Sequence, residues 1–492
     1  MATVRGVSPD ADLPRRVRGV LDAAGYSDEG ILEVLGGEEL GSLGGRRVPA
    51  LLRRTAGGSA LETLVRLFVV GVDVDEVAAR RAIAPMDLAD WVALGLVVPH
   101  DGRVRAALTL RCYQGLVVAS DFRRPEPGRG LPPDYVMGIT PSTLSLAALT
   151  VRRPVVATLD VGTGCGFQAF LAAQHSERVV GTDANPRAVQ VAELNAALNG
   201  LGTVSCRLGD LFEPVAGERF ALIVSNPPFI VSPGATHQFL STDRPGDVLC
   251  QQLARAAPSH LLDGGWCQFL CNWVEPADGT WESRLAGWFE GTGCDAWVMR
   301  RASQPADEYA CEWIETNTDE PAEFARRFDE WMATYEELGI AGIGFGLVTM
   351  RRREGTNWFR IDDAPETLGF PAGDDIGRLF DRADVLTFAD DASLLEMCFR
   401  LPAEVHMVQE CRPGRDEWEV ISAEVRRTGG LGYSGSIDPA GARLLARCDG
   451  HRSLRTLLAE IVAETDASLT DVEASSVAIV RRLVERGLLE PT

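Results

Sequence analysis

Hydrophobic and polar positions follow two alternating patterns through the middle third of the chain. Short apolar runs typical of buried strands are separated by stretches whose apolar residues recur at helical spacing. The predicted strands are 155–160, 179–183, 204–207, 221–225, 266–273, 296–300 and 343–351. Helices are predicted between most of them, for example over 186–199. This alternation predicts an α/β fold, with a doubly wound sheet of seven strands within residues 131–355.

The N-terminal part has a different pattern. Residues 13–100 show helical spacing, and Ser59 with Glu62 has the spacing of a capping box. Residues 100–122 contain two short strand-like runs around a turn, so we expect a helical, winged-helix-like domain over residues 1–130. Its end coincides with a stretch rich in Pro, Gly and Arg at 122–134, which is typical of a linker.

Two further regions flank the last predicted strands. Residues 303–338 are acidic and aromatic and are predicted to form a helical insertion in the sheet domain. Residues 356–492 are predicted to form an α+β extension that ends in a winged-helix-like module from residue 436 onward. That module resembles small peptide-binding domains of the PqqD-like fold, and a structural or dimerisation cap is the alternative.

The net charge bears on which partners the protein binds. The chain carries 48 basic and 70 acidic side chains, for a net charge of -22, and contains no lysine. Such a chain does not attract a polyanion as a whole. A contact with RNA would have to come from a local patch. Residues 1–130 are the least unfavourable place for one, because their 17 basic and 17 acidic side chains balance and they contain Arg103, Arg105 and Arg111.

The composition also argues against a metalloprotein, a disulfide-bonded protein and a membrane protein. The eleven cysteines contain no CxxC pair, so we expect core residues rather than a metal site or disulfides. The N-terminus has no apolar segment typical of a signal peptide, and the apolar runs are too short to span a bilayer. We therefore expect a cytoplasmic protein with no membrane partner and no metal.

The first candidate site follows the strand at 155–160. That strand ends in Asp160 and continues into Gly162, Thr163, Gly164 and Gly166, after which a helix is predicted. Glycines permit a sharp turn and a close approach of a ligand to the backbone. The following helix N-terminus offers free N–H groups. Together these features predict a cofactor loop.

A second signal comes from the next strand, which ends in Asp183, followed by Ala184. An acid at this place accepts hydrogen bonds from ribose hydroxyls. Farther on, Asp210 and Leu211 follow the third strand in a Gly-Asp-Leu-Phe sequence. On turn preferences alone, a turn cap is the alternative explanation for Asp210.

The catalytic candidate is the sequence Asn226-Pro227-Pro228-Phe229, directly after the fourth strand. Two prolines stiffen the loop and remove two backbone donors. The Asn226 side chain and the Pro227 carbonyl offer acceptors for the two N–H groups of an amide or aromatic amine, and Phe229 offers a face for stacking. This arrangement favours methylation of a planar nitrogen without a strong general base.

The order of glycine loop, acid, Gly-Asp and NPPF motif resembles class I S-adenosylmethionine-dependent methyltransferases over residues 136–275. The resemblance implies a Rossmann-like sheet and S-adenosylmethionine as the cofactor. It places the adenine near Asp210 and Leu211, and the cofactor also beside Asn226. A segment with Thr140 and Thr143 is implied to cover the methionine end, although both threonines are also explained as helix caps.

Within this family the chain resembles the HemK/PrmC-like group and the methyltransferase small group. The first implies a protein glutamine side-chain amide as the acceptor, in a release-factor-like substrate, which we favour. The second implies an exocyclic amine of a base in ribosomal or transfer RNA, and a non-catalytic binding protein with the same fold is a third hypothesis. Residues 356–492 have no counterpart in either group.

Overall fold

The computed structural model describes residues 12–37, 48–122, 131–234, 246–315, 320–366, 368–415, 418–464 and 468–492. The chain divides into two compact units, which are described separately below. The first comprises residues 1–147 and 154–362, and the second comprises residues 148–153 and 363–492. The predicted domain boundaries at residues 130 and 355 stay predictions, and most of the predicted linker lies outside the described residues.

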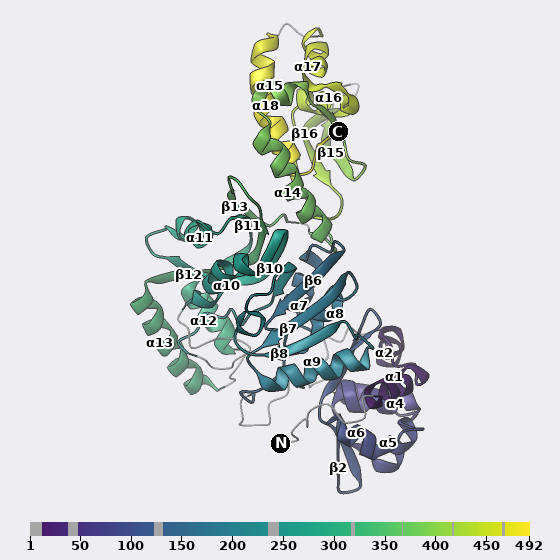
Figure 1. The fold of residues 1–492 in the computed structure, drawn as a ribbon. Helices are drawn as coiled ribbons and strands as arrows, with labels where there is room; N and C mark the ends of the chain where they lie inside the picture. The colour runs from purple at the N-terminus through teal and green to yellow at the C-terminus, as the bar shows by residue number, and fades with distance from the viewer. Residues whose placement is uncertain are drawn as a thin grey trace. The chain divides into compact units, whose positions relative to one another are not determined.

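An eight-stranded sheet forms the centre of the first unit, and its strand order is β13-β11-β12-β10-β9-β6-β7-β8 (Figure 1). The strands are β6 (Val155–Val161), β7 (Ser176–Asp183), β8 (Val204–Leu208), β9 (Phe220–Ser225), β10 (Leu261–Pro276), β11 (Cys294–Pro305), β12 (Ile340–Arg352) and β13 (Phe359–Asp363). The first five run parallel, and β12 is antiparallel to both β10 and β11. The predicted α/β fold with a Rossmann-like sheet is therefore confirmed.

The prediction of seven strands is wrong by one edge strand, β13. This strand is only half-buried, so its sequence lacks the apolar run that marks the inner strands. Polar contacts near its ends connect it to β11: the Trp358 carbonyl accepts from the Ala296 N–H, and Asp362 accepts from the Trp297 indole at 2.8 Å. Local hydrophobic periodicity does not detect an edge held in this way.

Helices cover the sheet on both sides of the parallel strands. They include α7 (Pro141–Leu149), α8 (Phe167–Ala172), α9 (Pro186–Leu198), α10 (Val248–Ala256) and α11 (Trp281–Phe289). Helix α9 begins as the sequence predicts, because Asn185 caps it by accepting from the Arg187 N–H and Pro186 occupies its first turn. Helices α8 and α9 pack against β6, β7 and β8.

The predicted helical insertion consists of α12 (Ala306–Glu315) and α13 (Pro321–Leu338), between β11 and β12. Its expected start at residue 303 is wrong, because β11 pairs with β12 as far as Pro305. The two helices pack on each other and on β12. Helix α13 ends at Gly339, whose φ of 64° lets the chain turn directly into the next strand.

The N-terminal part of the first unit contains helices and two hairpins. The helices are α1 (Leu13–Ala23), α2 (Asp28–Leu35), α3 (Val48–Arg54), α4 (Ala60–Val65), a π-helical turn (Arg66–Val70), α5 (Glu76–Ala82) and α6 (Leu88–Ala93). The capping box of Ser59 and Glu62 is confirmed. A short strand, β1 (Val74–Asp75), pairs with the first hairpin.

The expectation of two strand-like runs around one turn within residues 100–122 is wrong, because this range holds three complete strands and the end of a fourth, which together form two hairpins. They are β2 (Val97–His100), β3 (Arg103–Ala106), β4 (Thr109–Tyr113) and β5 (Leu116–Ser120). Both connections are two-residue turns with positive φ, Asp101-Gly102 and Gln114-Gly115. Turns of this kind match the twist of paired strands, so each closes its own hairpin.

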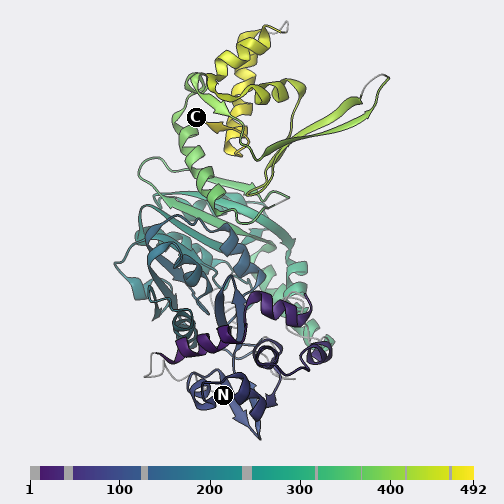
Figure 2. The ribbon, with the colours of Figure 1, turned by 90° about the vertical axis from the view of Figure 1, so that its right-hand side faces the viewer.

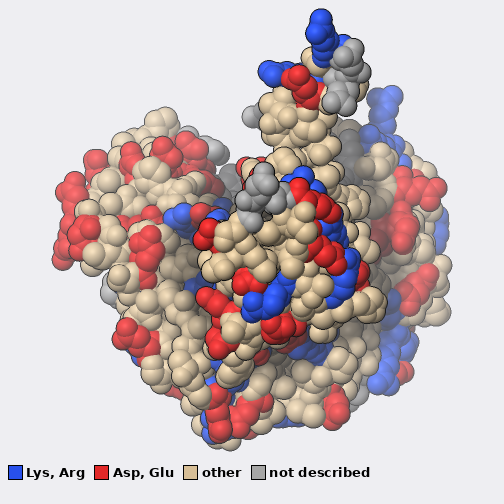
Figure 3. Space-filling view, turned by 90° about the horizontal axis from the view of Figure 1, so that it is seen from above, with Lys and Arg blue, Asp and Glu red and all other residues tan. Residues whose placement is uncertain are grey.

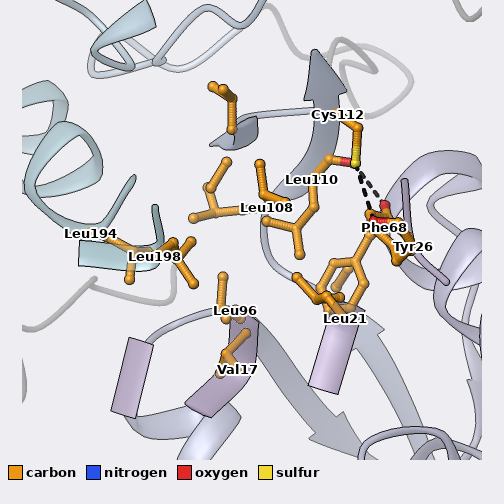
Figure 4. Packing of buried hydrophobic residues seen from close by; sticks show 14 of the residues in the cluster. Val17, Leu21, Tyr26, Phe68, Leu96, Leu108, Leu110, Cys112, Leu194 and Leu198 are labelled. Carbon is orange, nitrogen blue, oxygen red and sulfur yellow. Dashed lines mark hydrogen bonds between the residues drawn. The ribbon is translucent and has the colours of Figure 1, made fainter. Parts of the chain in front are cut away.

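The second hairpin is attached to helix α9 of the sheet domain. Asn195 exchanges two hydrogen bonds with the backbone of Ala119, and Asn199 does the same with Val117, all at 2.7–2.9 Å. Figure 4 shows Leu194 and Leu198 of α9 among the apolar side chains of the N-terminal part. The N-terminal part and the sheet thus share one core.

The second unit begins with α14 (Gly373–Phe388) and α15 (Asp391–Glu396). It continues with β14 (Cys398–Arg400), β15 (Val405–Pro413), β16 (Trp418–Arg427), β17 (Ser434–Ser436), α16 (Pro439–Arg447), β18 (Asp449–Ser453), α17 (Leu454–Val462), α18 (Leu469–Glu485) and β19 (Glu490–Pro491). Strands β15 and β16 form a long ribbon that is largely exposed (Figure 2). In the described part of the chain, no helix combines the length and apolarity that a membrane crossing requires.

Candidate active site

Four parallel strands bring the predicted site segments to one edge of the sheet. In spatial order these strands are β8, β7, β6 and β9, and Asp210, Asp183, the glycine loop and Asn226 follow their respective carboxyl ends. The strand ends are level, since Val161 of β6 aligns with Thr182 of β7 and with Ser225 of β9. Ligands of open α/β sheets bind at this edge, where the strand order reverses.

The glycine loop is shaped for close approach of a ligand to its backbone. Gly162, Gly164 and Gly166 all have positive φ, at 70°, 54° and 89°. A Cβ added at Gly162 or Gly164 would meet open space, whereas one at Gly166 would lie 2.2 Å from the Phe170 ring. The first two glycines therefore leave room for a bound molecule, and the third allows the loop to pack on α8.

Asp160, near the end of β6, and Thr163, within the loop, are both buried. One Asp160 carboxylate oxygen accepts from the Thr163 hydroxyl at 2.7 Å and from the Ala169 N–H at 3.1 Å. Burial raises the pKa of Asp160 to about 7, against the opposing effect of these hydrogen bonds. Asp160 thus connects the strand, the loop and the start of α8.

Asp183 connects the glycine loop with the two strands beside it. Its carboxylate accepts from the Gly164 N–H and the Asn185 N–H, both at 2.8 Å, and its carbonyl accepts from the Gly209 N–H at 3.0 Å. Burial raises the pKa of Asp183. A carboxylate has about four acceptor positions, so two remain for ribose hydroxyls.

Residues on the far side of Asp183 complete this half of the site. Asp210 and Leu211 line a depression of about 510 Å³ together with Gln252 and Arg255 of α10. Leu211 has a positive φ of 46°, and its carbonyl accepts from the Thr182 hydroxyl at 3.0 Å. Ala184 is exposed directly after the end of β7.

Asn226 has a buried acceptor without a partner. The preceding residue is fixed, because the Ser225 hydroxyl donates to the Val161 carbonyl at 2.7 Å. The Asn226 amide nitrogen is 3.5 Å from the Thr143 hydroxyl. Among the described residues, nothing donates to the Asn226 Oδ1, although this atom is buried. Buried polar atoms are normally paired, so an unpaired one next to a cofactor loop is a position for a ligand N–H.

Thr140 and Thr143 join the two halves of the site at the start of α7. Their hydroxyls are 2.8 Å apart, and the Thr140 hydroxyl also accepts from the Thr143 N–H, which is a helix cap. Gln168 of α8 donates to the Thr143 carbonyl at 2.8 Å. The structure thus brings Thr143 to Asn226 and leaves Thr140 in the capping role.

Phe229 is half-buried and packs on Phe345 of β12, with ring centroids 5.6 Å apart. Pro227 is buried and Pro228 is half-buried between Asn226 and this aromatic pair. The four residues Asn226–Phe229, called the acceptor loop below, therefore lie together at the end of β9. The described residues hold no group of three or more His, Cys, Asp or Glu side chains arranged for a metal ion.

Comparisons with known proteins agree with this geometry. A family model described as "Methyltransferase small domain" matches residues 141–283, which contain both loops. Two models described only as domains of unknown function match residues 23–107 and 377–491. The chain is 32% identical over 226 residues to the release factor glutamine methyltransferase of Cereibacter sphaeroides, covering 41% of this chain and 79% of that relative.

This coverage decides the family. The chain belongs to the HemK/PrmC-like class I methyltransferases. A release factor glutamine methyltransferase of Xylella fastidiosa is 38% identical over 130 residues, covering 24% of this chain and 47% of the relative. A ribosomal protein uL3 glutamine methyltransferase of Bradyrhizobium diazoefficiens is 36% identical over 121 residues, with coverages of 22% and 38%. The chain thus spans about half or less of these last two relatives.

Some residues of the site were not predicted. Ser225 and Asn185 are local, and the Asn-Pro start of α9 is a capping signal that could have identified Asn185. Gln168 and two tyrosines of the insertion, Tyr309 and Tyr335, act through contacts with residues distant in sequence. No local pattern indicates such contacts.

Proposed function

We propose that the chain transfers a methyl group from S-adenosylmethionine to the side-chain amide of a glutamine in a protein. The observation that carries this proposal is the buried, unpartnered Asn226 Oδ1 next to the glycine loop. A cytoplasmic location, where translation proteins and this cofactor occur together, is part of the proposal.

The residues of the donor half fit the cofactor. Open space at Gly162 and Gly164 permits contact with the backbone, and Asp183 has acceptor positions left for the ribose. Asp210 and Leu211 would border the adenine, Ala184 the ribose, and Thr140 and Thr143 the methionine end. When bound, S-adenosylmethionine supplies an electrophilic methyl carbon attached to a sulfonium. On transfer the sulfonium becomes a thioether, and the amide nitrogen gains the methyl group and releases a proton to solvent.

The acceptor half would make this poor nucleophile react. The Asn226 Oδ1 would accept one N–H of the substrate amide, and the Pro227 carbonyl would accept the other. Both contacts favour electron density on nitrogen and strengthen as positive charge develops there. Pro228 keeps the loop stiff, and Phe229 offers a flat surface for the planar amide.

RNA is the second candidate acceptor, and its sequence signals are weakened by the contacts of two arginines and the burial of a third. Arg105 forms an ion pair with Asp73 at 2.9 Å, and Arg103 donates to the Asp73 carbonyl at 2.7 Å. Arg111 is half-buried, and this burial lowers its pKa, so less of its side chain is open to a phosphate than on a free surface. Figure 3 shows acidic and basic side chains in separate groups on a face made mostly of other residues.

The proposal is tested by acceptor chemistry. The full chain is incubated with methyl-labelled S-adenosylmethionine and bacterial lysate, and the product is treated with protease or RNase. We expect protease-sensitive label, recovered as N5-methylglutamine after enzymatic digestion and mass spectrometry. Label in RNase-sensitive material would make RNA the acceptor. Tight cofactor binding without transfer to either would favour the non-catalytic hypothesis.

A further inference from the structure

The chain segment after the NPPF motif is held by side chains rather than by backbone pairing. Strand β9 ends at Ser225, and none of the described residues 227–233 forms a backbone–backbone hydrogen bond. Pro227 and Pro228 have no N–H to contribute. A loop of this kind keeps one geometry only if other contacts fix it.

Two tyrosine hydroxyls supply such contacts at a single residue, Val231. The Tyr335 hydroxyl donates to the Val231 carbonyl at 2.7 Å, and the Val231 N–H donates to the Tyr309 hydroxyl at 3.4 Å. All three residues are buried, with exposed fractions between 1% and 4%. Both backbone polar groups of Val231 therefore have a buried phenol hydroxyl as partner, and loss of a partner is costly for a buried polar group.

The two phenols come from the two insertion helices, Tyr309 from α12 and Tyr335 from α13. Trp331 packs between them, with ring centroids 6.4 Å from Tyr309 and 5.9 Å from Tyr335. The Tyr309 hydroxyl also accepts from the Asn272 amide at 2.6 Å, and Asn272 lies within β10. The insertion is thus fixed to the sheet on one side and to the acceptor loop on the other.

We infer that Tyr309 and Tyr335 are positioning residues that hold the loop from Asn226 to Phe229 in its reactive geometry, which assigns a role to the insertion. This inference rests on the proposed function. Val231 is close enough in sequence that its displacement moves Phe229 and, through the stiff Pro227-Pro228 pair, Asn226. A shift of about 1 Å at reacting groups is sufficient to lower turnover about 100-fold.

The test compares Tyr335→Phe with Tyr26→Phe. Tyr26 is a matched control, because its buried hydroxyl also donates to a carbonyl, that of Leu110, at 2.7 Å (Figure 4), but in the N-terminal part. We expect similar falls in melting temperature for both variants. Only Tyr335→Phe should lower kcat, by tenfold or more, with the KM for S-adenosylmethionine changed less than twofold.

A second readout needs no activity. Hydrogen exchange measured by mass spectrometry on the full, cofactor-free chain should accelerate in the peptide covering residues 226–234 in Tyr335→Phe and stay unchanged in Tyr26→Phe. Unchanged exchange, or a kcat loss no larger than that of Tyr26→Phe, would overturn the inference. If the wild-type chain methylates nothing, the proposed function fails, and the exchange result alone decides whether the tyrosines hold the loop.

Discussion

The two loops at the site edge of the sheet are built on opposite principles. In the glycine loop, the buried acid Asp160 has hydrogen-bond partners, and Asp183 receives two backbone N–H groups. In the acceptor loop, the buried Asn226 Oδ1 has none among the described residues. The buried polar groups of the first loop are paired within the protein, whereas the buried oxygen of the second is not. We therefore expect substitutions in the first loop to affect binding of the methyl donor and substitutions in the second to affect reaction of the acceptor.

Asn226→Ala has the largest expected effect and tests whether the two loops have different roles. If the unpaired oxygen serves the acceptor, kcat should fall about 100- to 1000-fold, as for loss of a contact that is strongest in the transition state. The Kd for S-adenosylmethionine, measured by calorimetry, should stay within about threefold, because the neighbouring Ser225–Val161 contact survives. Full activity in this variant would refute the amide-binding role.

Asp183→Ala tests the other loop. Two charge-assisted hydrogen bonds that shape the loop are lost together with the ribose acceptor, so we expect the cofactor Kd to rise about 30-fold or more. Calorimetry measures this directly. Asp438→Ala, which removes a helix cap in the second unit, is the control and should leave the Kd unchanged. An unaltered Kd in Asp183→Ala would show that Asp183 does not bind the cofactor.

The pH dependence of donor binding sharpens the same contrast. The pKa of Asp160 is raised from 3.8 to about 7, so between about pH 4 and pH 7 the folded, cofactor-free protein holds a proton that the unfolded chain has released. The free energy of unfolding of the cofactor-free chain should therefore fall as the pH rises from about 4 to 7. A cationic sulfonium favours the ionised acid, so donor affinity should rise over the same range and level off above it.

Opposite trends in chemical denaturation and in calorimetry would confirm this linkage. For a single coupled proton, affinity changes at most about tenfold per pH unit. Asp160→Asn has no proton to release, so both pH trends should be reduced in it. If the two trends in the wild-type chain ran in the same direction, Asp160 would not be coupled to the donor.

Substitutions of two glycines in the same loop have the smallest expected effects, and these effects should differ in kind. Gly166→Ala forces a Cβ against the Phe170 ring at a φ of 89°, and we expect about 1–3 kcal/mol of lost stability. Gly162→Ala faces open space, so it should cost about 1 kcal/mol from its φ of 70° and should weaken donor binding by filling the cradle. Thermal denaturation and calorimetry distinguish the two, and equal effects of both substitutions would contradict the separate roles.

Sequence reasoning succeeded where the determining signal is local. The glycine loop, the acid at the end of β7 and the NPPF motif each follow a strand whose apolar run is buried on both faces, and parallel strands place their ends together. The motif therefore indicated both the family and the edge of the sheet where Asn226 lies. Its role in binding an acceptor stays a prediction.

The rest could not be predicted because it depends on distant contacts. Strand β13 is an edge strand held partly by indole and carboxylate groups, and Tyr309 and Tyr335 meet Val231 across 78 and 104 residues of sequence. The error in residues 100–122 is different in kind, since the Asp101-Gly102 turn was visible and indicates a hairpin.

The paired carboxamides of Asn195 and Asn199 have a consequence for how this molecule can be divided. Each binds both polar groups of one backbone residue in the neighbouring hairpin, as an extra strand would. A fragment lacking that hairpin would expose the two carboxamides and the apolar side chains of Leu194 and Leu198 to water. The N-terminal part is thus attached to the sheet domain by an interface like that between two subunits. Exchanging the N-terminal part between relatives would require these four side chains to be exchanged as well.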